Sequence, residues 1–165
     1  MGIATRMRGL GNVGVYKYAN CTTKEDMQKI NNNYKNDLLL GEWNYVLPKL
    51  KAANSGAIFN NITALKKFNT DLPVCVNANA MFENSTNMYE FNGGISAAPD
   101  CRKTFYGTRL RKTEYDFSSA TDGYMLFSRI NTIETSSVVF PKLTNAFEMF
   151  GHVTDCIHLK VVIQK

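Results

Sequence analysis

Five phenylalanines recur along the sequence at an almost constant interval. In order they are Phe59, Phe82, Phe105, Phe127 and Phe150, so the intervals between them, by subtraction, are 23, 23, 22 and 23 residues. A fixed period of this length is the signature of a solenoid, in which each repeat stacks on its neighbours. The sequence therefore predicts a repeat protein.

Two further columns keep the same register as the phenylalanines. Five residues before each phenylalanine stands an asparagine or aspartate, and four residues before it stands a small residue. The polar column is Asn54, Asn77, Asp100, Asp122 and Asn145, and the small column is Ser55, Ala78, Cys101, Gly123 and Ala146. Because Asn and Asp side chains accept hydrogen bonds from the free amides that open a helical turn, we expect a short helix or 3₁₀ turn there. The small residue marks where that turn approaches its neighbour.

Apolar residues recur after each phenylalanine as well. The column six residues on is Leu65, Met88, Leu110 (after one deletion), Ile133 and Cys156, and the column about thirteen residues on is Leu72, Ile95, Phe117, Phe140 and Ile163. Between these columns, apolar residues such as Phe68 and Phe91 alternate with charged ones, which is typical of a short strand with one buried face. Each copy is thus predicted to run through a turn, a strand, a second turn and a short helix.

Two adjoining stretches resemble a known repeat family. Residues 65–73 (LKKFNTDLP), followed by residues 77–84 (NANAMFEN), are similar to the repeat unit of the BspA-type leucine-rich repeats, and the similarity in period extends over residues 47–165. The resemblance implies an α/β solenoid, a leucine-rich-repeat-like stack of short strands and short helical turns. It also implies adhesion or recognition at the surface of a cell or of a virus particle.

The first part of the chain is expected to close the N-terminal end of the stack. Residues 1–21 are interpreted as a basic, glycine-rich arm followed by a first strand around Val13 and Val15, and residues 22–165 as the solenoid. Thr22 and Glu25 have the spacing of a capping box, so a helix over residues 23–34 is expected to act as the N-terminal cap. Tyr34 then takes the place of a first phenylalanine.

Composition and motifs argue against several functional classes. The chain has 165 residues, a length typical of one domain, and contains no run of 18 apolar residues and no apolar signal-peptide core near Met1, so no membrane span is predicted. The G-x-G-x-x-G spelling at residues 9–14 lacks a preceding buried strand and is interpreted as coincidence. The four cysteines are expected to be buried free thiols. No catalytic, cofactor or metal constellation is recognised, so the chain is predicted not to be an enzyme.

Charged residues on the predicted strands define a candidate partner-binding face. It consists of Lys66, Lys67, Tyr89, Glu90, Arg111, Lys112, Glu114 and Glu134. The formal charge is +5, and one copy also contributes Arg102, Lys103 and Arg109. The interleaved glutamates interrupt the continuous positive stripe that tracking of nucleic-acid phosphates requires, so nucleic acid is an unfavoured partner and a mixed-charge protein-binding face is preferred.

The C-terminal copy ends on an apolar strand. Leu159, Val161 and Ile163 form a candidate assembly edge, because an unpaired strand is a template for pairing with another chain. The leading hypothesis is a non-enzymatic repeat scaffold that mediates protein contacts or self-association, as a structural or accessory subunit of a larger assembly such as a phage virion. The alternative is an adhesin-like module at a virion or cell surface that binds a host glycan or protein through its strand face.

Overall fold

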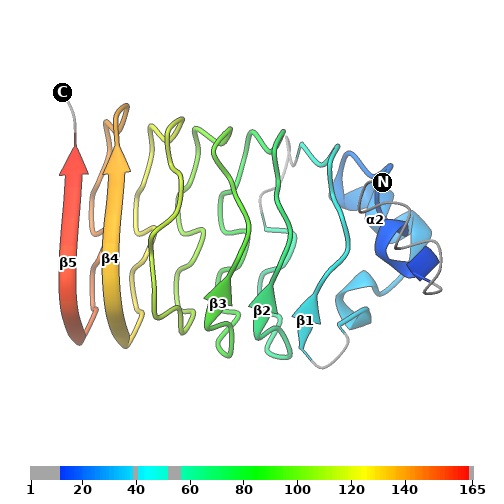
Figure 1. Cartoon of the computed structure of the whole chain (residues 1–165), viewed down its shortest axis with the longest axis horizontal. Coiled ribbons are helices and arrows are strands. Elements are labelled where there is room, and N and C mark those ends of the chain that lie inside the picture. The colour runs from blue at the N-terminus through cyan, green and yellow to red at the C-terminus, as the bar shows by residue number, and fades with distance from the viewer. Residues whose placement is uncertain (1–11, 39–40, 52–56, 164–165) are drawn as a thin grey trace, which may run out of the picture.

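The computed structural model, which describes residues 12–38, 41–51 and 57–163, shows a parallel β-solenoid (Figure 1). The short strands β1 (Glu42–Trp43), β2 (Lys67–Phe68) and β3 (Glu90–Phe91) form one sheet, and the longer strands β4 (Thr132–Phe140) and β5 (Asp155–Ile163) form another. Helix in the described residues is confined to η1 (Asn12–Tyr16), α2 (Lys24–Ile30) and η2 (Tyr34–Asn36). The predicted solenoid is therefore confirmed.

Successive copies pair in parallel and in register. Glu42 lies beside Lys67, and Lys67 lies beside Glu90, whereas Lys112 pairs with Thr135 on β4. A second ladder follows the polar column and joins Asn77 to Asp100, Asp100 to Asp122, and Asp122 to Asn145. Equivalent side chains of neighbouring coils therefore lie side by side in rows that run along the stack.

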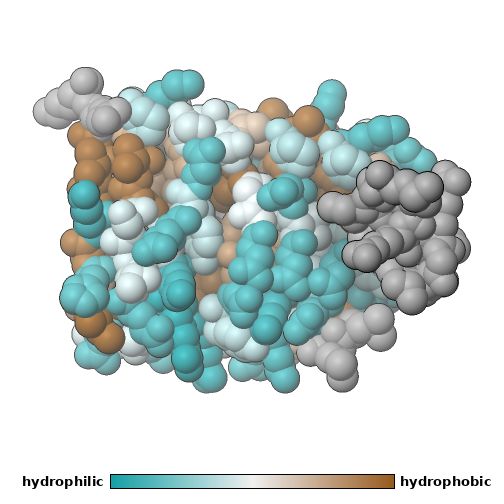
Figure 2. All heavy atoms as spheres, viewed as in Figure 1, coloured by the Kyte–Doolittle hydropathy of each residue, from teal (hydrophilic) through white to brown (hydrophobic). Residues whose placement is uncertain are grey.

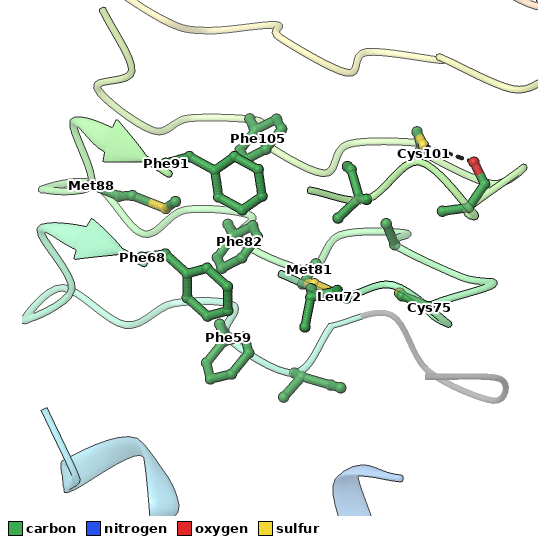
Figure 3. Packing of buried hydrophobic residues seen from close by; sticks show 14 of the residues in the cluster. Phe59, Phe68, Leu72, Cys75, Met81, Phe82, Met88, Phe91, Cys101 and Phe105 are labelled. Atoms are coloured by element: carbon green, nitrogen blue, oxygen red, sulfur yellow. Dashed lines mark hydrogen bonds between the residues drawn. The ribbon is translucent and has the colours of Figure 1, made fainter. Parts of the chain in front are cut away.

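The phenylalanine column forms a continuous stack of rings through the core. Ring centroids lie 5.6 Å apart for Phe59 and Phe82, 5.6 Å apart for Phe82 and Phe105, and 5.7 Å apart for Phe105 and Phe127. A second column, which consists of Trp43, Phe68 and Phe91, runs beside it. Figure 3 shows Phe68 and Phe91 of this column next to Phe59, Phe82 and Phe105. Stacked contacts within a column and edge-on contacts between columns are the arrangements that aromatic rings prefer. The two columns together hold each coil against the next.

The asparagine and aspartate column opens turns instead of the expected helices. The Oδ1 atom of Asn77 accepts a hydrogen bond from the amide of Asn79 at 2.9 Å. Asp100, Asp122 and Asn145 accept hydrogen bonds from the amides two residues further on in the same way. These Asx turns use the capping chemistry that the sequence indicates, but a turn and not a helix follows. Asn54 and Ser55 lie outside the described residues.

The amides that follow explain why no helix forms there. Alternate amides, those of Ala78, Ala80 and Phe82, donate to the carbonyls of residues 100, 102 and 104 in the next coil. A helix would use the same amides for its own carbonyls. The alternation places Ala80 and Asn84 at φ of 53° and 57°, in the left-handed region. The intervening amides, such as those of Met81 and Glu83, donate to the carbonyls three residues back, so single turns form. The short helix predicted for each copy is therefore wrong, because coil-to-coil hydrogen bonds take every second amide.

The small and apolar columns are buried until the last copy. Ala78, Cys101 and Gly123 are buried, as are Leu65, Met88, Leu110 and Ile133. In the last copy Ala146, Cys156 and Ile163 are exposed, because no further coil of the described chain covers them. The expectation of buried free thiols therefore holds for Cys21, Cys75 and Cys101 but is wrong for Cys156.

The N-terminal segment differs from its prediction. The strand expected around Val13 and Val15 is absent, since residues 12–16 form η1 and the following amides donate to carbonyls three residues back. Helix α2 is shorter than the predicted residues 23–34. Its capping box joins Thr23 and Asp26, one position later than the predicted Thr22 and Glu25, because the Asp26 carboxylate accepts hydrogen bonds from the amides of residues 22 and 23. Residues 1–11, which include the start of the predicted arm and the first half of the glycine motif, lie outside the described residues.

Two tyrosines cover the first rings of the aromatic columns. Tyr18 stacks on Trp43 at 5.5 Å, and Tyr34 meets Phe59 edge-on at 6.2 Å while its hydroxyl donates to the carbonyl of Ile58 at 2.6 Å. Tyr34 therefore takes the place of a first phenylalanine, as its spacing predicts. Both tyrosines lie outside α2, so these ring contacts with the first coil come from the segments that flank the helix and not from the helix that was predicted as the cap.

Removing one ring of the stack should destabilise the whole solenoid. We expect Phe82→Ala to lower the free energy of unfolding by about 3 to 5 kcal/mol, as truncation of a large buried side chain does. Denaturant unfolding followed by circular dichroism measures the change. Phe147→Ala is the matched control, because Phe147 is 59% exposed. Equal effects of the two substitutions would contradict the assigned core.

The N-terminal segment should loosen in acid. The Asp37 carboxylate accepts hydrogen bonds from Lys17 Nζ at 2.6 Å, from Asn31 Nδ2 at 2.7 Å and from the Tyr18 hydroxyl. Burial raises the pKa of Asp37, but these hydrogen bonds outweigh burial and hold the pKa below its ordinary value. The stabilisation is therefore present above the unfolded-state pKa of about 4 and is lost as the pH falls through the lower folded-state pKa.

Substitution of this carboxylate tests the acid effect. Asp37→Asn should lower the thermal midpoint at neutral pH and flatten its decline between about pH 5 and pH 2, because the titrating group is gone. Thermal melts over that range measure the profile. An unchanged slope would show that Asp37 does not couple folding to protonation.

Candidate binding surfaces

The strand side of the solenoid carries rows of outward polar side chains. Figure 2 shows hydrophilic residues gathered over β2 and β3 and hydrophobic residues gathered at the end formed by β4 and β5. Of the eight residues predicted for the partner-binding face, seven line one of three adjoining hollows on this side, and these are Lys66, Tyr89, Glu90, Arg111, Lys112, Glu114 and Glu134. The structure therefore brings the predicted residues together on one surface.

The eighth residue, Lys67, belongs to a row of alternating charge. Its Nζ lies 3.4 Å from a carboxylate oxygen of Glu90 and 3.8 Å from one of Glu42, on the coils at either side. The hydrogen bond to Glu90 raises the pKa of Lys67. Hydrogen bonds from Asn92 and Lys67 lower the pKa of Glu90 against the opposing effect of desolvation. The row is thus held together by ion pairs between its own members.

An asparagine ladder runs beside this row. The side-chain amide of Asn92 donates to Asn69 Oδ1 at 2.7 Å, and the amide of Asn69 donates to Asn44 Oδ1 at 2.8 Å. Each amide bridges the spacing between adjacent parallel strands, which is about 4.8 Å. The ladder fixes the orientation of these side chains on the rim of the strand face.

A hollow of about 710 Å³ opens where the inner aromatic column ends. Thr113 takes the place that Phe91 holds one coil earlier, and a hydroxyl-bearing side chain cannot fill the volume of a ring. Tyr115 fills part of that space, with its ring centroid 5.0 Å from that of Phe91 and 5.7 Å from that of Phe105. The backbone of residues 113–117 departs from strand geometry there. The hollow therefore lies where the inner aromatic column gives way to Thr113, and Phe91 and Tyr115 are among the residues that line it.

A smaller hollow of about 330 Å³ adjoins the first and is basic. Its described lining contains no carboxylate and consists of Lys66, Asn87, Tyr89, Arg109 and Arg111. A third hollow of about 150 Å³ continues past Arg109 and Arg111 to Asn131 and Thr132. The side chains come from four successive coils, so the basic surface exists only in the stacked solenoid.

The predicted assembly edge lies at the opposite end from α2 (Figure 1). Strand β5 pairs with β4, and no other strand of the described chain adjoins it. Leu159 is 54% exposed and Ile163 is 46% exposed, while Val161 is partly buried. Register pairs them with Ser136, Val138 and Phe140, which are buried. The three residues thus belong to the core rows of the solenoid but lie open.

The basic side chains of residues 102–112, the most basic copy in the sequence, lie on two different sides of the coil. Arg102 lies 2.8 Å from Asp100, and Lys103 lies 3.7 Å from Glu83, away from the strand face. Arg109, by contrast, lines the basic hollow and was not included in the predicted face. The sequence does contain a signal that Arg109 faces outward, because it stands two residues before Arg111. It belongs to the same outward row as Asn87 and Asn131. Tyr115 was missed because it occupies an irregular segment.

The described residues contain no group of three or more His, Cys, Asp or Glu side chains that could hold a metal ion. No helix within the described ranges is long and apolar enough to span a bilayer.

The sequence matches no protein-family model, and comparisons with curated proteins and with solved structures find no significant match. The relation to BspA-type leucine-rich repeats therefore stays a prediction.

The buried hydroxyl beneath the large hollow should be a weak point. Thr113 is fully buried, and its Oγ1 has no hydrogen-bond partner among the described residues. Thr113→Val should raise the free energy of unfolding by about 1 kcal/mol, because it removes an unsatisfied polar atom at nearly constant volume.

A second threonine provides the control. The Thr104 hydroxyl is also buried but contacts the carbonyl oxygens of Ala78 and Cys101, each at 2.9 Å. Thr104→Val should therefore destabilise the protein by about 1 kcal/mol. Denaturant unfolding compares the two, and a loss of stability in both variants would refute the assignment of Thr113.

Proposed function

We propose that the protein is a non-enzymatic solenoid scaffold that assembles through the exposed edge of β5. The observation that carries the proposal is a nine-residue strand that, among the described residues, pairs with β4 alone. Its core-row residues Leu159 and Ile163 are exposed, and Val161 between them is partly buried. An edge of this kind offers backbone donors and acceptors together with apolar side chains, which is what strand addition requires. The rest of the solenoid holds this edge rigid.

The partner that fits this edge is a second copy of the chain, joined tail to tail. A head-to-tail arrangement is disfavoured because Tyr18 and Tyr34 already cover the first rings at the other end. Antiparallel pairing centred on Val161 places Leu159 opposite Ile163 of the second copy. It places Lys160 opposite Val162, so no like charges face each other across the centre. Such a two-fold contact closes as a dimer and does not propagate.

We propose a structural or accessory role within a larger particle, at a virion or cell surface, on the strength of the resemblance to BspA-type repeats. The second candidate function is an adhesin-like module that binds a host glycan or protein through the strand face. The adjoining hollows on that face favour this alternative, because a purely structural surface has no need of them. The two functions use different surfaces and do not exclude each other.

Val161→Lys tests the assembly edge. The wild-type chain should sediment as a dimer at micromolar concentration, and the variant as a monomer with a similar thermal midpoint, because a charge is placed at the centre of the contact. Val76→Lys is the matched control, since Val76 is 45% exposed on a distant coil, and it should remain dimeric. Analytical ultracentrifugation gives the masses. A monomeric wild type, or a dimer that survives Val161→Lys, would overturn the proposal.

A further inference from the structure

The basic hollow is lined by three cations, of which one has an ion pair among the described residues. Lys66 lines it from one coil, Arg109 and Arg111 line it from the coil two further along, and the intervening coil contributes the uncharged residues Asn87 and Tyr89. Arg111 has one ion pair, at 3.6 Å from Glu134. Neither Lys66 nor Arg109 has an ion pair with any residue that the structure describes. Like charges so placed repel one another, and a bound anion would relieve that repulsion.

The lining side chains can also position an anion. An arginine guanidinium presents paired donors that match the two oxygens of a carboxylate or sulfate, and two arginines with a lysine can hold such a group from several directions. The Asn87 side-chain amide donates to the carbonyl of Thr63 at 2.8 Å, which fixes its orientation and leaves its carbonyl oxygen as an acceptor. The small hollow is thus suited to one anionic group with a neighbouring hydroxyl.

The larger hollow lies where the part of a ligand beyond its anionic group would bind, so its lining indicates the chemistry of that part. It shares Tyr89 and Arg111 with the basic hollow, but Lys112 and three carboxylates also line it, so its carboxylates outnumber its cations by three to two. The three are Glu90, Glu114 and Glu134. These carboxylates would repel a second phosphate or sulfate and would accept hydrogen bonds from hydroxyl groups. Tyr89 is 40% exposed and offers a ring for an apolar face of the ligand. The surface therefore fits a molecule with one anionic group attached to a polyhydroxylated body.

We propose that the strand face binds an acidic oligosaccharide, with its carboxylate or sulfate held by Lys66, Arg109 and Arg111 and its neutral hydroxylated part over Tyr89 and the glutamates. A nucleic acid is a poorer fit, because its regularly spaced phosphates would meet the carboxylates of the larger hollow. The inference deepens the second candidate function by naming the ligand class. It involves no residue of β5, so the proposed assembly can fail without affecting it.

Calorimetric titration with a small set of probes tests the inference. Sialyllactose and trigalacturonate supply a carboxylate on a sugar, lactose is the neutral counterpart of the first, and oligothymidylate supplies phosphates without the sugar hydroxyls. We expect at least one acidic saccharide to bind, lactose to bind at least about tenfold more weakly, and added salt to weaken the binding. Binding of oligothymidylate more tightly than both acidic saccharides would overturn the assignment, as would binding of neither acidic saccharide.

Substitutions locate the site. Arg109→Gln and Lys66→Gln should each weaken the acidic saccharide at least about tenfold, since each removes a charged donor. Their matched controls are Arg129→Gln, whose side chain lies over the Tyr106 ring at 5.5 Å, and Lys29→Gln on α2, where the lysine side chain is 78% exposed. The controls should bind as the wild type does. All four side chains lie at the surface, and unchanged thermal midpoints will show that the fold is intact. Equal losses in variants and controls would refute the site.

Discussion

Contact between consecutive coils is the interaction on which every other feature of this molecule depends. Each coil gives half of its turn amides to the next coil and stacks its phenylalanine on the ring before it. No coil can satisfy its own backbone or bury its own ring alone, so the structure is stable only as a stack. The stacking continues along the strand face. It is interrupted at the hollows, and it ends at the open edge of β5.

The interruption and the unfinished end have different physical origins. At the large hollow the inner column changes from a ring to Thr113, and Tyr115 enters from a neighbouring position to cover part of the loss. At β5 the core rows continue with Leu159, Val161 and Ile163, but no coil of the described chain follows to cover them. The first creates a concave polar surface and the second a flat apolar one. Surfaces of such different character suit ligands of different kinds, which is why the two proposals do not compete.

The sequence predicts the repeat register closely, because the columns reflect a stacking contact that each copy must make. The rows of Phe82 and Ala78, and the role of Tyr34 as a first ring, follow from spacing alone. The short helices do not, since an Asn such as Asn77 serves equally well to open a helix or a turn. What decides between them is whether the following amides find acceptors in the next coil, which is a non-local fact. The predicted N-terminal strand fails for the opposite reason, because its amides are satisfied locally.

The candidate surfaces also contain some features that the sequence predicts and others that it does not. Outward residues such as Arg111 and Glu134 are predictable from strand alternation, and the edge residues from the apolar end of the chain. The hollows are not, because they depend on how Thr113 and Tyr115 repack the core, and Arg109 gains its significance only from the hollow beside it. Periodicity identifies which residues face outward, while the shape of the surface depends on the places where the periodicity fails.

Because the rows are in register, the length of the solenoid is a multiple of one fixed spacing. Each coil adds one strand spacing of about 4.8 Å to the distance between the covered N-terminal end and β5. An in-frame duplication or loss of one repeat in the regular part of the stack would change that distance by one unit and leave both ends intact. Length in such a protein can therefore vary in discrete steps during evolution, without redesign of either the end that is covered or the end that is open.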